Sequence, residues 1–183
     1  LEEVTVGAGW PTLTRARVHA VRAQAHLALD DVEAAREALA RAEELGADEL
    51  ETRLAGVRLA LADDGIERAL QLAAEFTDAF PESSRAWWLR ARAAMVANEP
   101  AAADEYLTRA IERDFAPHSE QLMRAQVRLS QEQYDAARED IEWLSERAPD
   151  DPRVGFAQGL LAWATGDQDT ACTHFHEVAA AAP

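Results

Sequence analysis

Small and apolar residues recur along the chain at a fixed period. Alanine stands at five positions that are each thirty-four residues apart: Ala35, Ala69, Ala103, Ala137 and Ala171. A second column of small or short residues lies twelve residues before it: Ala23, Val57, Ala91, Ala125 and Gly159. Apolar residues also follow each alanine at spacings of four and seven, which is a helical pattern. This period predicts one supersecondary unit copied five times, in which each copy buries its apolar face against its neighbours.

Turn and capping residues interrupt the pattern between the two columns. They include Asp30-Asp31, Asp63 to Gly65, Asn98 to Pro100 and Gly166-Asp167, and Pro100 is well placed as the first residue of a helix. Proline closes three of the copies, at Pro81, Pro149 and Pro183. Each unit is therefore predicted to be a helix A, a short turn, a helix B and a second turn.

The period and the small columns resemble the tetratricopeptide repeat (TPR) family, whose signature is a thirty-four-residue helix-turn-helix. The resemblance covers residues 16–183 and implies an all-α fold, a right-handed α-solenoid in one domain. The repeats are 16–49, 50–83, 84–117, 118–151 and 152–183, and residues 1–15 form an N-terminal segment leading into the first helix. One departure is position 7, where the family usually has a large apolar residue. Here it holds Arg22, Gly56, Arg90, Arg124 and Gln158.

The chain is strongly acidic, with thirty-four acids, eighteen basic residues and a net charge of −16. Such a field repels phosphate backbones and anionic lipid surfaces, which argues against nucleic acid or a membrane surface as partner. No apolar stretch reaches the length of about eighteen residues that a spanning helix needs, so no membrane insertion of this chain is expected. The compartment stays open between the bacterial cell envelope or periplasm and the cytoplasm.

Basic residues concentrate in the A helices. Positions 1 to 14 of the repeats hold ten arginines and three acids, although acids outnumber arginines in the rest of the chain. In the TPR family the A helices line the concave side of the superhelix, so the resemblance implies a basic trough inside an acidic shell. Arginine suits this role because its planar fork matches carboxylates and other oxyanions. The candidate groove residues are Arg17, Gln24, Arg58, Arg85, Trp88, Arg92, Gln126 and Arg153.

Each of these features has a structural alternative. The arginines of helix A can pair with the acids of helix B, and Arg22, Arg90, Arg124 and Arg128 at positions 7 and 11 are expected to point that way. Trp88, Phe156 and Trp163 could form flat apolar surface in the groove. For the tryptophans at helical spacing, Trp87, Trp88, Trp143 and Trp163, a place in the core is the favoured interpretation.

Motifs that carry chemistry are missing from the sequence. There is no glycine-rich phosphate loop, nucleophile elbow, His-Glu-x-x-His or Cys-x-x-Cys, so we expect no enzyme, no catalytic residue and no cofactor. Cys172 and His176 would share a helix face while His174 points away, which leaves two ligands where a structural zinc site needs four, and no metal is expected. The lysine, asparagine and arginine clamp by which some TPR proteins hold chaperone tails is also missing.

These observations predict a non-catalytic protein-interaction scaffold. Its arginine-lined face would bind an acidic peptide segment of a partner protein or an anionic glycan. The alternative is a structural spacer from a longer TPR array, with an empty groove. The last repeat resembles the degenerate repeats of bacterial envelope proteins in exopolysaccharide export or exosortase systems, which would place such a spacer in the cell envelope. The last B helix has no polar helix after it, so Phe175 and Val178 are expected to be partly bare, which would allow self-association through this end.

Overall fold

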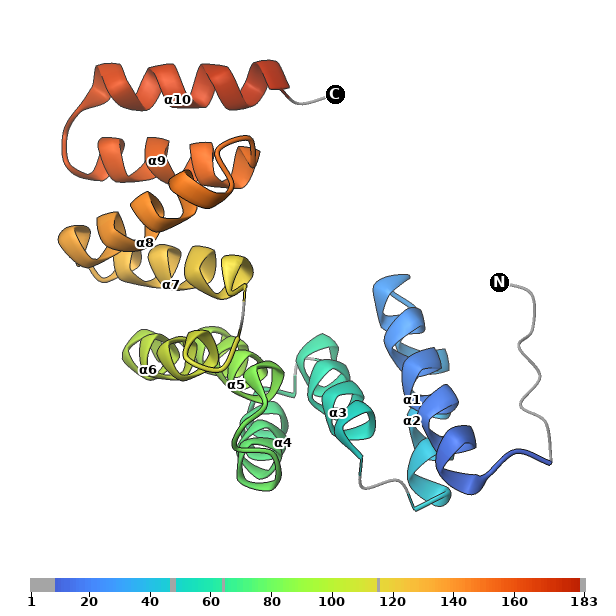
Figure 1. The fold of residues 1–183 in the computed structure, drawn as a ribbon. Helices are drawn as coiled ribbons and strands as arrows, with labels where there is room; N and C mark the ends of the chain where they lie inside the picture. Colours follow the sequence, from blue (N-terminus) through green and yellow to red (C-terminus); the bar gives the residue numbers. More distant parts are fainter. Residues whose placement is uncertain (1–8, 47–48, 64, 115, 182–183) are drawn as a thin grey trace. The chain divides into compact units, whose positions relative to one another are not determined.

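A computed structural model of the chain describes residues 9–46, 49–63, 65–114 and 116–181. These residues form helices and turns, with no strand among them (Figure 1). The A helices are α1 (Thr12–Ala28), α3 (Leu50–Ala62), α5 (Ser84–Val96), α7 (His118–Ser130) and α9 (Pro152–Ala164). The B helices are α2 (Val32–Glu44), α4 (Ile66–Ala79), α6 (Pro100–Ile111), α8 (Tyr134–Arg147) and α10 (Gln168–Ala181). The predicted all-α fold of helix-turn-helix repeats is confirmed.

The thirty-four-residue period is kept in the helix boundaries. All five B helices begin thirty-four residues apart, and α3, α5, α7 and α9 begin at the first residue of their predicted repeats. Only α1 differs, because it begins at Thr12, four residues before Ala16. Helix α6 begins at Pro100, as the sequence predicts. Proline suits that place because its fixed φ is helical and its missing N–H would have no partner there.

The turn between helix A and helix B has the same backbone conformation in four repeats. Its residue at position 15 has a positive φ, of 60° at Asp30, 59° at Asn98, 59° at Glu132 and 88° at Gly166. Asp, Asn and Gly reach this left-handed region most easily, whereas Glu132 adopts it at some cost. The equivalent Asp64 lies outside the described residues. The turns at Asp30 and Gly166 also supply the next helix with a cap, since Asp31 accepts the amide of Ala34 and Asp167 accepts that of Thr170.

The two small columns form the close crossings of the helices. All five alanines of the period are fully buried, and the column twelve residues earlier is buried throughout. Gly159 shows why size matters there, since a Cβ at this position would lie 2.5 Å from a ring carbon of Phe175. A larger residue would therefore push α9 and α10 apart.

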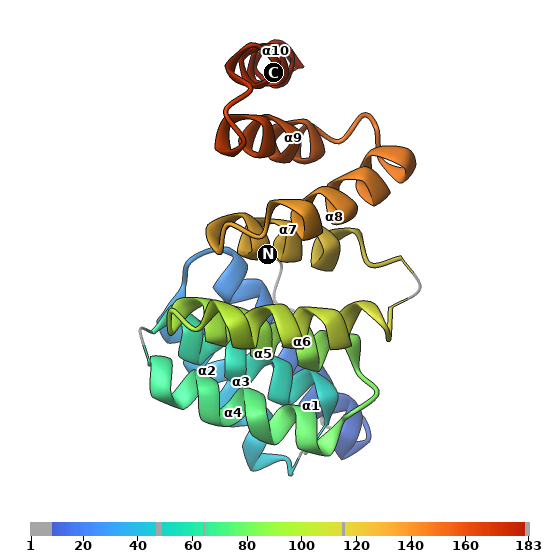
Figure 2. The same cartoon turned by 90° about the vertical axis from the view of Figure 1, so that its left-hand side faces the viewer.

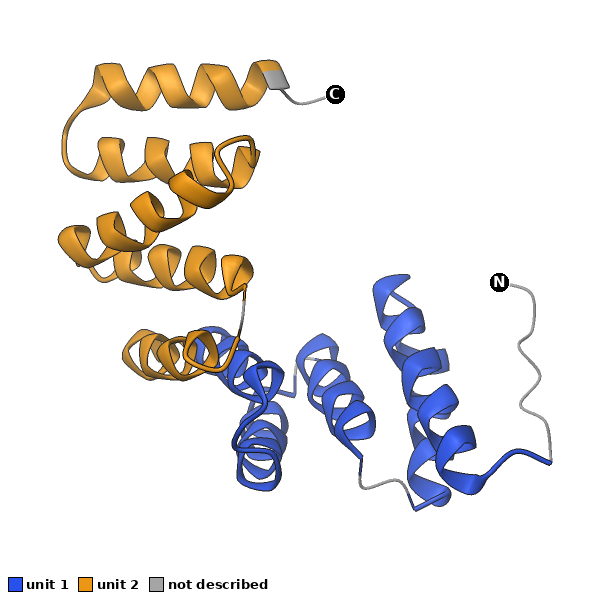
Figure 3. Ribbon diagram, viewed as in Figure 1, with its two compact units in different colours: residues 1–97 blue, residues 98–183 orange. Residues whose placement is uncertain are grey.

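The chain divides into two compact units, which Figure 3 colours separately. Unit 1 is residues 1–97 with α1 to α5, and unit 2 is residues 98–183 with α6 to α10. In unit 1, one core cluster joins α1, α2 and α3 and another joins α3, α4 and α5, around Val57, Phe76 and Leu89. In unit 2 a cluster around Ile141 and Leu144 joins α7, α8 and α9, and Figure 2 shows α7 to α10 stacked in chain order. That residues 16–183 act as one domain stays a prediction.

Candidate ligand-binding face

The A helices of unit 1 lie in a row, because α1 packs against α3 and α3 against α5 (Figure 1). Residues at one repeat position therefore come from neighbouring helices. Six candidate residues belong to this row, and none of them is buried. They are Arg17, Gln24, Arg58, Arg85, Trp88 and Arg92, which together with Glu51 we call the unit 1 face.

Arg58 and Arg92 have equivalent places at position 9 of consecutive repeats. Both are half-buried, and neither makes a hydrogen bond or ion pair with another described residue. Burial, and then repulsion from Arg58, lower the pKa of the Arg92 guanidinium. The two guanidinium groups are therefore close enough to repel each other, and an arginine side chain is a permanent cation in proteins. Together they offer donors for an anion.

Trp88 lies beneath Arg92. The central carbon of the Arg92 guanidinium is 5.0 Å from the centre of the indole ring, which is a cation–π geometry. The ring itself packs against the core cluster of α3, α4 and α5. Its indole N–H is buried without an acceptor among the described residues. Trp88 thus belongs partly to the core and partly to the face, where it holds the Arg92 side chain in place.

The residues at position 2 of the same repeats, Arg17, Glu51 and Arg85, already have partners within the chain. Glu51 accepts hydrogen bonds from the amide of Gln24, at 2.9 Å, and from the guanidinium of Arg85, at 3.4 Å. Arg17 lies 3.7 Å from Glu49 and is well exposed. The two arginine contacts are long and exposed, so a ligand carboxylate could replace them at little cost, whereas the bond from Gln24 is partly buried. The unpaired arginines lie at position 9 and the paired ones at position 2.

Two candidates of the predicted groove belong to unit 2. Gln126 is exposed on α7. Arg153 makes a bidentate pair with Asp151 at the start of α9, with the shortest contact at 2.7 Å. Hydrogen bonds from Arg153 lower the pKa of the Asp151 carboxyl. Arg153 is therefore paired within the chain, but with the N-cap residue of its own helix and not with an acid of a B helix.

The aromatic residues divide between core and surface. Trp87 is buried, and its indole N–H donates to the carbonyl of Pro81 at 2.7 Å. Trp143 contacts both the His118 ring and the guanidinium of Arg147. The core interpretation is wrong for Trp163, whose residue surface is 61% exposed on α9. Helix α9 has its buried face in Val154, Ala157 and Ala162, and Trp163 points away from that face because it lies one residue beyond Ala162.

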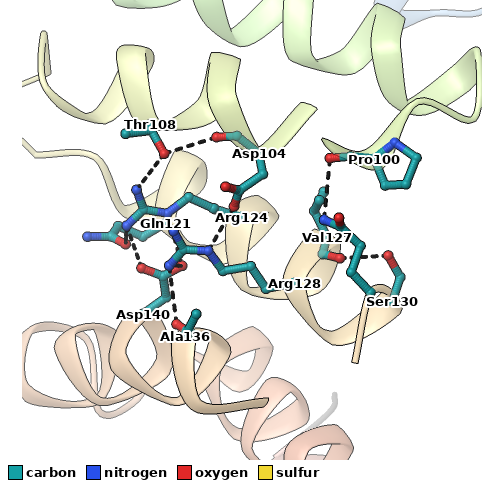
Figure 4. A network of polar contacts seen from close by, with 11 residues as sticks. Pro100, Asp104, Thr108, Gln121, Arg124, Val127, Arg128, Ser130, Ala136 and Asp140 are labelled. Atoms are coloured by element: carbon teal, nitrogen blue, oxygen red, sulfur yellow. Dashed lines mark hydrogen bonds and ion pairs between the residues drawn. The ribbon is translucent and has the colours of Figure 1, made fainter. Parts of the chain in front are cut away.

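The arginines at positions 7 and 11 of α7 do pair with acids of the B helices, as expected (Figure 4). Arg124 holds both oxygens of Asp140, at 2.6 and 3.0 Å, and Arg128 reaches the same carboxylate at 3.0 Å. Arg128 also donates to Asp104 of α6 at 2.7 Å. The Asp140 side chain is only 3% exposed. This network ties three helices of unit 2 together, and it holds both arginines with side chains that are only 13% and 14% exposed.

Polar bridges replace the large apolar residue that the family usually has at position 7. Arg90 of α5 donates to the hydroxyl of Thr77 on α4 at 2.6 Å. Gln158 of α9 donates to the hydroxyl of Ser145 on α8 at 3.0 Å. Thr77 and Ser145 occupy the same position of their repeats, so a hydroxyl there is the signal in the sequence that could have predicted the bridge.

Neither a metal site nor a membrane-spanning helix is found among the described residues. Within residues 9–181, where described, no three histidine, cysteine or acidic side chains gather as a metal site. Cys172 is exposed, and the nearby His176 ring contacts only the Cys172 carbonyl among the described residues. Among the described helices, none has both the length and the apolar character needed to cross a membrane. The unit 1 face is therefore the best-supported candidate site.

Two family models match the sequence. The coatomer epsilon subunit model matches residues 13–151, and a tetratricopeptide repeat model matches residues 122–183. Between them they span α1 to α10, with the same thirty-four-residue period throughout. No curated protein matches the sequence.

Several solved structures share the fold at low sequence identity. The thermophilic TPR protein TTC0263 of Thermus thermophilus is 18% identical, with 92% of each chain covered and a TM-score of 0.75. The MamA protein is 19% identical, with 91% of each chain covered and a TM-score of 0.71. YrrB, described as a TPR protein with an unusual peptide-binding site, is 14% identical, with 90% of this chain and 85% of YrrB covered and a TM-score of 0.68. At these identities the similarity concerns the fold alone.

Proposed function

Because the chain belongs to the tetratricopeptide-repeat family and also matches the coatomer epsilon subunit model over residues 13–151, we propose that it is a protein-interaction scaffold. The unit 1 face binds an extended acidic segment of a partner protein. The observation that carries this proposal is the pair Arg58 and Arg92, which have no counter-ion among the described residues of a protein with a net charge of −16.

The pair is unfavourable by itself. Burial and the positive charge of Arg58 both disfavour the charged form of Arg92, as its lowered pKa indicates. A carboxylate placed between the two guanidinium groups would remove this repulsion and accept charge-assisted hydrogen bonds from both. The chain has acids in excess, yet none of the described ones is used here. This arrangement suits recognition of an external carboxylate better than stabilisation of the fold.

The geometry favours a peptide over a glycan. Sugar rings bind proteins by lying flat on an exposed aromatic face, but Arg92 already lies over the indole of Trp88. Repeat-equivalent residues such as Arg58 and Arg92 lie on adjacent A helices, so successive side chains of an extended peptide can meet them in turn. The peptide-binding site described for YrrB, a protein of the same fold, is in line with this choice.

The other residues of the face have supporting roles in this proposal. Arg85 can leave Glu51 and Arg17 can leave Glu49 to donate to the ligand, since these two contacts are long and exposed. Gln24 keeps Glu51 in place through its partly buried hydrogen bond. Glu51 disfavours a ligand carboxylate at its own position and so sets the spacing of acids in the peptide. Gln126 and Arg153 belong to unit 2, where Arg153 would have to exchange Asp151 for a ligand.

The proposal is tested by binding of a fluorescein-labelled Asp/Glu-rich peptide, followed by anisotropy at low and moderate salt. Arg58→Glu with Arg92→Glu is expected to weaken binding by about tenfold or more, because each substitution replaces a charge-assisted donor by a like charge. Binding to the wild-type protein is expected to weaken as salt rises, since accessible charges are screened. An anionic polysaccharide tested in parallel is expected to bind more weakly than the peptide.

A matched control is Arg41→Glu with Arg109→Glu, which makes the same change of net charge on the B helices α2 and α6. Both arginines are exposed there, beside Glu44 and Glu105 respectively. This control is expected to keep most of the affinity. Equal loss in both double variants would mean that only the overall charge matters. No peptide binding by the wild-type protein would leave the spacer function instead.

A further inference from the structure

A second concave site lies in unit 1, on the side of α3 that faces the B helices. It is a cleft of about 540 Å³ between α2, α3 and α4. This volume lies within the range of about 300–1,000 Å³ that is usual for small-molecule sites. Leu39, Leu59 and Leu72 provide apolar walls, one from each helix. The cleft shares no residue with the unit 1 face.

Gly56 of α3 accounts for the open floor of the cleft. It holds position 7, where the other repeats carry an arginine or a glutamine. A Cβ on Gly56 would meet only Leu39 and Leu72, each at the ordinary contact distance of 3.9 Å. A larger side chain would therefore project into the cleft between these two leucines. The glycine is costly in a helix, and no positive φ requires it there.

The equivalent places in unit 2 show what normally occupies this space. Between α6, α7 and α8 it holds Arg124 and Arg128 with their carboxylate partners. Between α8, α9 and α10 a cleft of about 570 Å³ remains. There position 7 holds Gln158, whose side chain already donates a hydrogen bond to the Ser145 hydroxyl. Of these three places, only the cleft at Gly56 combines open space with apolar walls on all three helices.

One polar group in the wall of this cleft has no partner among the described residues. Thr52 is 6% exposed, and its hydroxyl makes no hydrogen bond with any of them. A buried hydroxyl without a partner is unfavourable, and a ligand that enters the cleft could satisfy it. Arg36, Arg53 and Arg68 also line the cleft, against the two carboxylates Glu43 and Asp63. The excess of cations is local, since the second cleft has Arg138 and His174 against three acids, Glu142, Glu146 and Asp167.

We propose that the cleft at Gly56 binds a small aliphatic carboxylate. The alkyl chain lies against Leu39, Leu59 and Leu72, and the carboxylate reaches the arginines and the Thr52 hydroxyl. Arg36 is held at the edge by its pair with Asp63, at 3.0 Å, and keeps further N–H groups for the ligand. The site is independent of peptide binding at the unit 1 face, so either can fail without the other.

Octanoate is a suitable probe, and the shifts of backbone amides in two-dimensional NMR spectra report where it binds. Saturable shifts are expected at Thr52 and Gly56. Gly56→Leu fills the floor and is expected to weaken binding by about tenfold or more, whereas Gly56→Ala adds one methyl group and is expected to change it by no more than about twofold. Both substitutions favour the helix, and circular dichroism checks that both variants fold. Thr52→Val keeps the shape, removes the hydroxyl and is expected to weaken binding about threefold or more.

A matched control is Gln158→Leu, which places the same side chain at the equivalent position of unit 2. It is expected to leave octanoate binding unchanged. Octylamine, which has a similar chain and the opposite charge, is expected to bind at least about tenfold more weakly than octanoate. Equal affinity of the wild-type and Gly56→Leu proteins would overturn the site. Equal affinity for octanoate and octylamine would overturn the carboxylate assignment, and shifts confined to the exposed Trp163 region would overturn both.

Discussion

The arginines of α3 and α5 in unit 1 and those of α7 in unit 2 have opposite environments. Arg58 and Arg92 occupy position 9 and have no hydrogen-bond or ion-pair partner among the described residues, although Arg92 lies over the ring of Trp88. Arg124 and Arg128 occupy positions 7 and 11, and their side chains, about one-eighth exposed, are held by Asp140 and Asp104. All four lie on A helices and are of one residue type. What separates them is the side of the helix from which each projects.

This difference follows from helix geometry. Positions 7 and 11 are four apart and share a face, whereas position 9 lies about 200° from position 7 and projects elsewhere. The face with positions 7 and 11 meets the B helices, where the acids of this chain are concentrated. The face with position 9 meets no acid-rich helix. Arginines on the first face therefore stabilise the fold, and arginines on the second remain available to a ligand.

The largest expected effect concerns the buried network of unit 2. Asp140→Asn removes the charge shared by Arg124 and Arg128 and leaves two largely buried cations without it. We expect the free energy of unfolding to fall by about 3–5 kcal/mol, because breaking a buried ion pair on one side leaves uncompensated charge. Chemical denaturation followed by circular dichroism measures this change.

The matched control is Arg58→Gln with Arg92→Gln in unit 1, which removes two charges that have no counter-ion among the described residues. This double variant is expected to change stability by about 0.5 kcal/mol or less, and relief of repulsion can make the change favourable. A loss comparable to that of Asp140→Asn would mean that the position 9 arginines support the fold after all.

A smaller effect is expected at the helix crossings, and it should be similar in the two units. Ala69→Leu in unit 1 and Ala137→Leu in unit 2 add a bulky side chain at fully buried positions. Each is expected to cost about 1–3 kcal/mol, because overpacking forces the helices apart. Thermal unfolding of these variants can be compared with Ala40→Leu and Ala101→Leu, at exposed positions of α2 and α6, which should have little effect. If the buried and exposed substitutions behave alike, the repeat register is wrong.

Much of the fold could be predicted from the sequence because its period is unbroken. The alanine column and the turn residues around Asn98 and Gly166 were enough to place the helices, since each crossing and turn has its own steric requirement. The pairing of Arg124 and Arg128 could also be predicted from their positions. The start of α1 at Thr12 could not, because the thirty-four-residue period places the first residue of that repeat at Ala16.

The site was less predictable, because it depends on which side chains reach one another. The pairing of Arg85 with Glu51 links residues that the period places in the same column, and only side-chain conformations decide whether they meet. Trp163 is exposed because it lies one residue beyond Ala162, which belongs to the buried face of α9. The cleft at Gly56 depends on a missing side chain, and a glycine in a helix does not by itself indicate a cavity.

The difference between the two sets of arginines is tested most directly by a measurement on their own guanidinium groups. The side-chain Nε–Hε resonances of arginine can be followed by NMR while the acidic peptide is added. We expect the resonances of Arg58 and Arg92 to shift and saturate together, because their donors are free to bind a carboxylate. Those of Arg124 and Arg128 should stay in place, because their Nε–H groups already donate to Asp140 and Asp104. Shifts at Arg124 and Arg128, or none at Arg58 and Arg92, would contradict the account.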